Sequence, residues 1–380
     1  MEASRKNLAV ISFSQFGATL SYNFVQVFLP FFIFKISPLS SQDTLLWIGA
    51  IMGSTSLFAA VTSTFWGSLT HRFNPKLLYL SAIMANSVVF LMLGFTANLR
   101  TILILRILQG SVGGTSTIGL IIVSSASSKD KVSVNIGFFQ SSMTLGQLVG
   151  PLLGSLAAAM LGYQGAFISA SFLMFASLVF SYLYVIDIPR LPRKGKAFGW
   201  ASLDKRIMIG WMLCFTAMIQ LTFLPSVLPN VFEKFSIERP LALKLAGTVV
   251  MLYTATAMFG TYLWSRLSRK VGLYRMITFL FAVGILSQWL LAFSRGIVSF
   301  TVIRMVQTGL VAATFPLIVS AFAGESKGSV IGFLNSARFA GNALGPIVAT
   351  SILAIADLTS VYFFVGAVTL LAFLGFKFFN

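Results

Sequence analysis

The feature that most constrains this chain is a series of twelve long apolar runs that are almost free of charged residues. Each run has at least the roughly twenty residues that an α-helix needs to cross the hydrocarbon core of a bilayer. The runs are too continuously apolar for the strands of a membrane barrel, in which polar and apolar residues alternate. The sequence therefore predicts an all-α integral membrane protein of about twelve transmembrane helices. The predicted spans lie near 8–34, 45–69, 76–98, 101–124, 132–160, 165–187, 207–230, 243–265, 273–294, 297–322, 329–355 and 359–378.

The composition excludes a soluble globular protein, because charged residues make up only 9% of the chain against about 25% in a soluble domain. A net charge of +18 would suggest nucleic-acid binding in a soluble protein, but here the cations lie between the spans, so no nucleic-acid partner is expected. One histidine and one cysteine predict no metal site. Without a phosphate-binding loop or a nucleophile–base set, we expect neither an ATP-driven pump nor an enzyme, and no cofactor.

Lysine and arginine are distributed unevenly between alternate loops. One set of loops carries eighteen of them, including Arg72, Lys131 and Arg269, whereas the other set carries six. The positive-inside rule places the richer set in the cytoplasm. Both termini are then cytoplasmic, which agrees with an even number of spans. The first apolar run continues to Phe34 and is too long for a cleavable signal peptide.

The two halves of the chain repeat each other. Gly137, Gly146, Gly150 and Pro151 recur 195 residues later as Gly332, Gly341, Gly345 and Pro346, while Trp66, Arg106 and Gln109 recur 198 residues later as Trp264, Arg304 and Gln307. Parallel repeats of six spans are typical of transporters that open alternately to either side around a site near the bilayer midplane. We predict six-helix bundles at 1–188 and 207–380. The basic linker 189–206 joins them and could also bind anionic lipid headgroups.

The glycines of the fifth span have a specific spacing, Gly137-x8-Gly146-x3-Gly150-Pro151-x2-Gly154. Glycines four residues apart share one helix face and let a neighbouring backbone approach closely. The full spacing resembles the antiporter motif of drug exporters in the major facilitator superfamily. The eleventh span repeats the motif, with Ala349 in place of the last glycine.

The loop after the second span resembles the cytoplasmic gating motif of the same superfamily, G-x-L-a-D-R-x-G-R-K. The matching residues are Gly67, Leu69, Arg72 and Lys76. His71 stands where the family has an aspartate that latches the gate, and Asn74 and Pro75 replace the family's glycine and arginine. The latch therefore lacks its carboxylate here, and His71 could serve only if protonated.

The fourth span opens with Arg106-Ile107-Leu108-Gln109-Gly110, which resembles the superfamily's R-x-x-Q-G motif. In antiporters of the family this arginine is linked to proton transfer, so Arg106 and its repeat Arg304 are the coupling candidates. With the glycine motif, the chain looks most like bacterial multidrug exporters of the twelve-span drug:proton antiporter group. The resemblance implies a monomeric exporter in the bacterial cytoplasmic (inner) membrane, with protons as the coupling ion.

The charges inside the predicted spans are unusual for a proton-coupled exporter of cations. All nine acidic residues lie outside the middle of the spans, so no proton-carrying carboxylate can be named. Arg106 and Arg304 lie about two turns inside the outer surface, where they could snorkel or bond carbonyls. Arg338 lies about 15 Å into the eleventh span, counting 1.5 Å per residue. Hydrogen bonds to carbonyls near Pro346 or attraction of an anionic or zwitterionic substrate would both explain it.

In the superfamily, the first, fourth, seventh and tenth spans line the central cavity. The polar candidates for substrate binding on these spans and on the fifth and eleventh are Tyr22, Asn23, Gln26, Gln109, Gln140, Gln220, Gln307, Asn335 and Arg338. Each of them taken alone is more often an interhelical hydrogen bond than a ligand contact.

Three functions are compatible with these features. The first is a secondary-active exporter of small amphipathic compounds, drugs among them. The second is a metabolite, siderophore or lipid transporter of the same superfamily, acting as an importer or facilitator. The third is a membrane sensor that has kept the fold and lost transport, which the missing carboxylates would allow.

Overall fold

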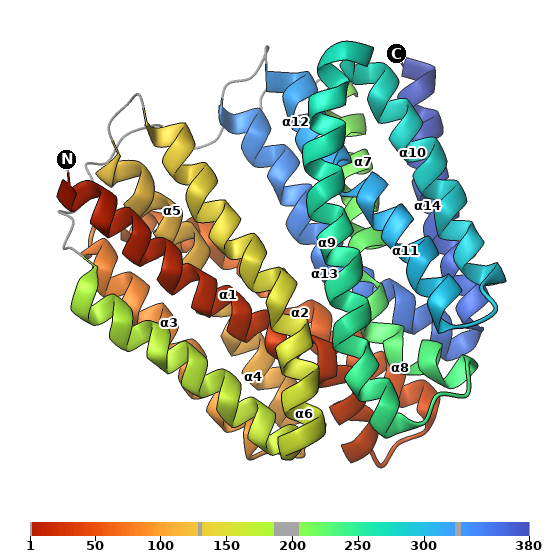
Figure 1. The fold of residues 1–380 in the computed structure, drawn as a ribbon, viewed down its shortest axis with the longest axis horizontal. Coiled ribbons are helices and arrows are strands. Elements are labelled where there is room, and N and C mark those ends of the chain that lie inside the picture. The colour runs from red at the N-terminus through yellow and green to blue at the C-terminus, as the bar shows by residue number, and fades with distance from the viewer. Residues whose placement is uncertain (1, 128–130, 186–204, 324–327, 380) are drawn as a thin grey trace. The chain divides into compact units, whose positions relative to one another are not determined.

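The computed structural model describes residues 2–127, 131–185, 205–323 and 328–379, and every regular element in these ranges is a helix (Figure 1). The helices are α1 (Glu2–Ile36), α2 (Ser41–Leu69), α3 (Pro75–Gly94), α4 (Leu99–Ser111), α5 (Thr115–Ala126), α6 (Val132–Tyr184), α7 (Lys205–Thr222), α8 (Leu224–Lys234), α9 (Arg239–Val271), α10 (Leu273–Leu290), the 3-10 turn η1 (Leu291–Phe293), α11 (Ile297–Val311), α12 (Thr314–Ala323), α13 (Gly328–Ile355) and α14 (Leu358–Phe379).

The described helices account for the twelve predicted spans. Ten segments are long and apolar enough to cross a membrane, and the bent pair α7 and α8, which meet at 42°, forms an eleventh. Helix α6 has 53 residues, which at 1.5 Å per residue is more than twice the thickness of a hydrocarbon core. Its backbone breaks at Gly162, where φ is 73°, so α6 contains both the fifth and the sixth predicted spans. The predicted all-α membrane fold is confirmed.

The chain forms two compact units. Unit 1 contains Met1–Ile36, Leu57–Gly195 and Leu243–Thr248, and unit 2 contains Ser37–Ser56, Lys196–Ala242 and Val249–Asn380. Each unit thus includes a short segment from the other half of the sequence. The predicted linker 189–206 lies outside the described residues except for its last two, and the division into bundles 1–188 and 207–380 stays a prediction.

In unit 1, α1 packs along α6, and α3 packs against α6 as well (Figure 1). Aromatic rings fill the contact between α1 and the second half of α6. The ring of Phe28 lies 5.0 Å from that of Phe167, and the ring of Phe32 lies 5.3 Å from it, both edge to face. Edge-to-face geometry is a favoured arrangement for aromatic pairs and adds to the apolar contact.

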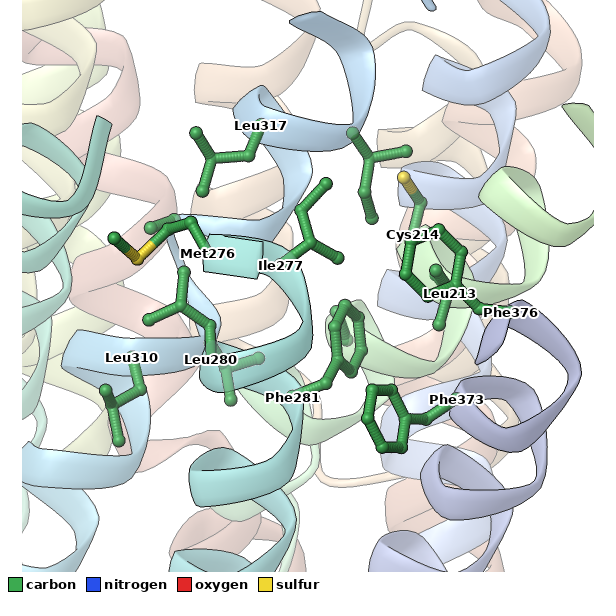
Figure 2. Close-up of a cluster of buried hydrophobic side chains, with 14 of the residues drawn as sticks. Leu213, Cys214, Met276, Ile277, Leu280, Phe281, Leu310, Leu317, Phe373 and Phe376 are labelled. Carbon is green, nitrogen blue, oxygen red and sulfur yellow. The ribbon is translucent and has the colours of Figure 1, made fainter. Parts of the chain in front are cut away.

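In unit 2, an apolar core joins α7, α10, the α11–α12 pair and α14 (Figure 2). Leu213 and Cys214 of α7 contribute to it, together with Phe281 of α10 and Phe373 of α14, whose rings stack 6.2 Å apart. Cys214 is fully buried in this cluster. This core fixes the helices that carry the polar residues of unit 2.

The fourth and tenth spans are each broken into two helices at nearly the same point of the repeat, between α4 and α5 and between α11 and α12. A tryptophan caps a carbonyl at each break. The Nε1–H of Trp66 donates to the carbonyl of Ser111 at 2.7 Å, and that of Trp264 donates to the carbonyl of Gly309 at 3.1 Å. Both pairs are separated by the same 45 residues. The repeat seen in the sequence therefore extends to the hydrogen bonds that hold these breaks.

Candidate functional site

Glycines let the first helix of each half lie very close to the fifth helix of that half. A Cβ atom added to Gly146 of α6 would lie 2.8 Å from the carbonyl oxygen of Phe16 in α1. In unit 2, a Cβ atom added to Gly341 of α13 would lie 2.7 Å from the carbonyl oxygen of Phe215 in α7. Real Cβ atoms do not come within 3.0 Å of backbone, so both positions require glycine.

The glycines of the fifth-span motif differ in how closely they are packed. A Cβ atom at Gly150 would lie 2.8 Å from the carbonyl oxygen of Leu20, and one at Gly154 would lie 2.6 Å from the carbonyl carbon of Phe24. At Gly137, in contrast, no atom lies within 4 Å of the added Cβ. Gly146, Gly150 and Gly154 therefore hold α6 against α1, whereas Gly137 has no such role.

Arg304 lies at the centre of a fully buried polar cluster in unit 2. Its guanidinium donates to Oε1 of Gln307 at 2.6 Å and to the carbonyl oxygens of Gln220 at 2.8 Å and Leu221 at 2.9 Å. Arg304 and the side chains of Gln220 and Gln307 are at most 1% exposed. This arginine does not snorkel to the surface, and it bonds carbonyls at the end of α7.

The proline at position 225 explains why the carbonyl of Leu221 is available. In a regular helix the carbonyl of Leu221 would accept from the amide of residue 225, but Pro225 has no N–H and its ring pushes against that carbonyl. The chain bends here, between α7 and α8. The Nη2–H of Arg304 therefore replaces the missing backbone donor to this partly buried carbonyl.

Neutral groups extend the cluster around Arg304. The amide of Gln307 donates to Oε1 of Gln220 at 2.8 Å and to Oε1 of Gln288 at 3.1 Å, and the amide of Gln220 donates to the hydroxyl of Thr369 at 2.8 Å. The guanidinium carbon also lies 5.0 Å from the ring centres of Phe223 and Tyr253. The charge is stabilised by dipoles and aromatic faces rather than by a carboxylate.

Arg106 holds the corresponding place in unit 1 with different partners. It is 2% exposed and donates to Oε1 of Gln26 at 3.0 Å and to Oε1 of Gln109. The Nε2 atom of Gln109 is buried without a hydrogen-bond partner. Nearby in sequence on α1, the hydroxyl of Tyr22 donates to Oδ1 of the buried Asn86. Both arginines thus pair with the glutamine three residues on. The second partner of Arg106 is the side-chain amide of Gln26, which can rotate, whereas the other partners of Arg304 are backbone carbonyls, which cannot.

Arg338 is the third arginine within a predicted span, and it is exposed. Its guanidinium carbon lies 5.8 Å from the ring centre of Phe315 in α12. No hydrogen bond or ion pair joins Arg338 to another described residue, so the predicted alternative of bonds to carbonyls near Pro346 is not observed. Asn335 and Asn342, each half-buried, lie on the same side of α13 as Arg338.

The remaining predicted binding residues do not join one group. Asn23 donates to the carbonyl of Thr19 within its own helix at 2.8 Å, a local bond. Gln140 is exposed on α6. The glycine-motif residue Gly332 and both prolines, Pro151 and Pro346, lie inside helices that continue past them.

The gating-motif loop has a structural explanation for its departures from the family pattern. Helix α2 ends at Leu69, and α3 begins at Pro75 after Asn74, whose side chain accepts from the amide of Lys76 at 2.8 Å. Asparagine is a favoured N-cap and proline suits the first helical position. Asn74 and Pro75 therefore start the third span, while His71 lies exposed between the helices.

The acids of the described residues lie at helix ends, as predicted. Asp43 is in the first turn of α2, Glu233 is in the last turn of α8, and Glu238 caps α9. Asp357 precedes α14, where the hydroxyl and amide of Ser360 donate to its carboxylate and hold the pKa of Asp357 below its usual value. Asp357 is therefore ionised at neutral pH and unsuited to carry protons.

Several polar residues of these clusters were not among the predicted candidates, namely Asn86, Tyr253, Gln288, Asn342 and Thr369. Repeat symmetry could not indicate two of them, because Asn86 corresponds to Gly284 and Gln288 corresponds to Phe90. Asn342 could have been found from its spacing, since it lies seven residues after Asn335 and four after Arg338.

Comparison with known proteins agrees with this architecture. The family model described as Major Facilitator Superfamily matches residues 11–346 and again residues 212–380. The multidrug resistance protein MdtG of Rahnella sp. is 22% identical over 96% of this chain and 91% of its own length. The staphyloferrin B transporter of Staphylococcus aureus is 23% identical over 96% of this chain and 90% of its own length. The crystal structure of the nucleoside transporter NupG superimposes with a TM-score of 0.77 at 13% identity, covering 99% of this chain and 98% of that one.

Proposed function

Because the chain belongs to the Major Facilitator Superfamily, we propose that it exports small amphipathic compounds, drugs among them, by proton-coupled alternating access. It is a multi-pass membrane transporter of small molecules and not an enzyme. The observation that carries export is the end-to-end similarity to multidrug resistance proteins. The cytoplasmic position of both termini and the bacterial inner membrane belong to the same proposal, as does a monomeric state.

The buried cation of unit 1 is the preferred coupling site. Arg106 is held by the side-chain amides of Gln26 and Gln109, which can rotate, and Nε2 of Gln109 has an unused donor. Arg304 also bonds the side chain of Gln307 and has a buried Nε without a partner, but its two backbone carbonyl partners at the proline bend cannot be exchanged without disturbing α7. A change of hydrogen-bond partners during transport is therefore expected at Arg106, and a fixed structural role at Arg304.

Proton coupling predicts that export in proteoliposomes follows an imposed pH gradient when the membrane potential is clamped. We expect efflux of a substrate to rise several-fold when protons flow in the opposite direction, and Arg106→Gln to lose this dependence while still allowing exchange of substrate. Flux and intravesicular pH would be measured together. Wild-type flux that ignores the gradient would favour a facilitator or another coupling ion.

A second candidate is an importer or exporter of metabolites, siderophores or lipids, which the similarity to the staphyloferrin B transporter favours. The two candidates differ in what competes for the site. In counterflow, an exporter of drugs should accept chemically unrelated amphipathic compounds, whereas a dedicated metabolite carrier should accept one class alone. A sensor without transport should show no counterflow with any compound.

A further inference from the structure

Arg338 lies at a depth where an exposed charge needs an explanation. The described part of its span runs from Phe333 to Ile355, and Arg338 is five residues inside that range. Its guanidinium is held beside Phe315, which is six residues, or about 9 Å at 1.5 Å per residue, from the end of its own span at Ala321. The charged group is therefore held beside an apolar ring that itself belongs to a span.

The side of α13 that carries Arg338 lies between two close contacts that this helix makes in unit 2, and its own neighbour there is Phe315 of α12. Gly341 and Gly345 face α7, while Ala343 and Ile347 face Gly53 of α2. Successive residues of a helix are turned by about 100° around its axis. On this basis Arg338 lies on the part of the helix circumference, or arc, between these two contacts.

The two arcs of α13 between these glycine contacts differ in character. One carries Asn335, Arg338 and Asn342, and the other carries Ala340 and the exposed Leu344. An arginine facing lipid costs about 2.5–3.5 kcal/mol at the centre of a span on insertion scales and less toward its ends, whereas leucine is favourable. The polar arc therefore suits water or a polar ligand better than lipid.

The polar arc has unused hydrogen-bonding groups and an uncompensated charge. Among the described residues, no hydrogen bond is made by the side chains of Asn335, Arg338 or Asn342, and no carboxylate pairs with Arg338. The described acids of unit 2 are committed to helix ends elsewhere. A guanidinium with free N–H groups beside two amides provides the fork geometry that binds a carboxylate or phosphate.

We propose that the polar arc of α13, formed by Asn335, Arg338 and Asn342, binds the anionic head of an organic acid, with Phe315 contacting its apolar part. The proposal rests on the function proposed above and specifies its substrate class as amphipathic organic anions. Arg338 would bind the head through paired charge-assisted hydrogen bonds, and the two asparagines would orient it.

Two probes that differ only in charge test this site. Dansylglycine has a free carboxylate, whereas dansylglycinamide has a neutral amide in its place, and both report binding to the purified protein by dansyl fluorescence. We expect the wild type to bind dansylglycine at least about tenfold more tightly, the ratio that corresponds to 1.4 kcal/mol. Arg338→Gln should remove this preference and leave binding of dansylglycinamide within twofold. Arg338→Lys, which keeps the charge without the fork, should give an intermediate ratio.

Controls separate this site from a structural role and from the proposed function. Arg295→Gln, at an exposed loop arginine, should leave the binding ratio unchanged. A wild type that binds the two probes equally, or binds neither, overturns the proposal, as does an Arg338→Gln variant that loses both probes equally. If Arg338→Gln does not fold, the Arg338→Lys and Asn342→Ala variants provide the same comparison. Selective binding without gradient-driven flux would contradict the proposed export and leave the anion site standing.

Discussion

Gly154→Ala is expected to destabilise unit 1 by about 2–4 kcal/mol, the upper part of the range for inserting a methyl group into a packed interface. The new Cβ would lie 2.6 Å from the carbonyl carbon of Phe24 and 2.8 Å from its Cα. Both are backbone atoms of α1, so no side-chain rotation can relieve the overlap, and α1 would have to move away from α6. The measurement is the thermal unfolding midpoint of the purified protein in detergent.

Gly137→Ala is the matched control for this prediction. It makes the same change in the same helix, where the added methyl group meets no atom within 4 Å. It should be neutral or stabilise by up to about 1 kcal/mol, because alanine favours a helix over glycine. Equal midpoints for the two variants would contradict the close approach of α1 and α6. The second half already carries a buried alanine, Ala349, at the position that repeats Gly154.

Arg304→Gln is expected to have the second large effect, a loss of about 2–5 kcal/mol in unfolding free energy. The change removes hydrogen bonds to Gln220, Leu221 and Gln307, each worth about 0.6–2 kcal/mol inside a membrane. It also removes the guanidinium donor from the partly buried carbonyl of Leu221. The thermal midpoint and the yield of monodisperse protein would both fall, with the exposed Arg295→Gln change as a control.

A second substitution tests the cause of this loss. If Arg304 replaces the amide that Pro225 lacks, Pro225→Ala restores a backbone donor to the carbonyl of Leu221. The double variant should then be more stable than Arg304→Gln alone by about 1 kcal/mol, the net contribution of one hydrogen bond. Additive losses from the two substitutions would show that the guanidinium does not act through this carbonyl.

The fold follows from the sequence because span length and charge asymmetry are strong, local signals. The repeat also predicted that Arg106 and Arg304 would occupy equivalent places, and each does donate to the glutamine three residues on. Their other partners could not be predicted from the repeat. The first and seventh spans are related by a shift of 199 residues, as Phe16 and Phe215 show. Under this shift Gln26 corresponds to Pro225, so no glutamine lies at the equivalent position in α7–α8.

The candidate binding residues show a similar limit. A sequence identifies polar residues in apolar spans, but it does not say whether a neighbour already satisfies them. Gln220 and Gln307 are already bonded to each other, and Gln220 is also bonded to Thr369. Arg338 has the same kind of sequence signal and no hydrogen-bonded partner among the described residues. Only the three-dimensional packing distinguishes a polar group with a structural role from one that is available to a ligand.

The break at Gly162 has a consequence for how this protein is made. The fifth and sixth spans are joined by a single left-handed residue, so there is no hydrophilic loop between them to be translocated separately. Neither span can reverse direction in the bilayer without the other, and the pair would enter the membrane during synthesis as one preformed hairpin. Because the backbone at Gly162 (φ 73°, ψ 172°) is one that essentially only glycine adopts, a residue with a side chain there would strain the reversal by about 1–3 kcal/mol and weaken this hairpin.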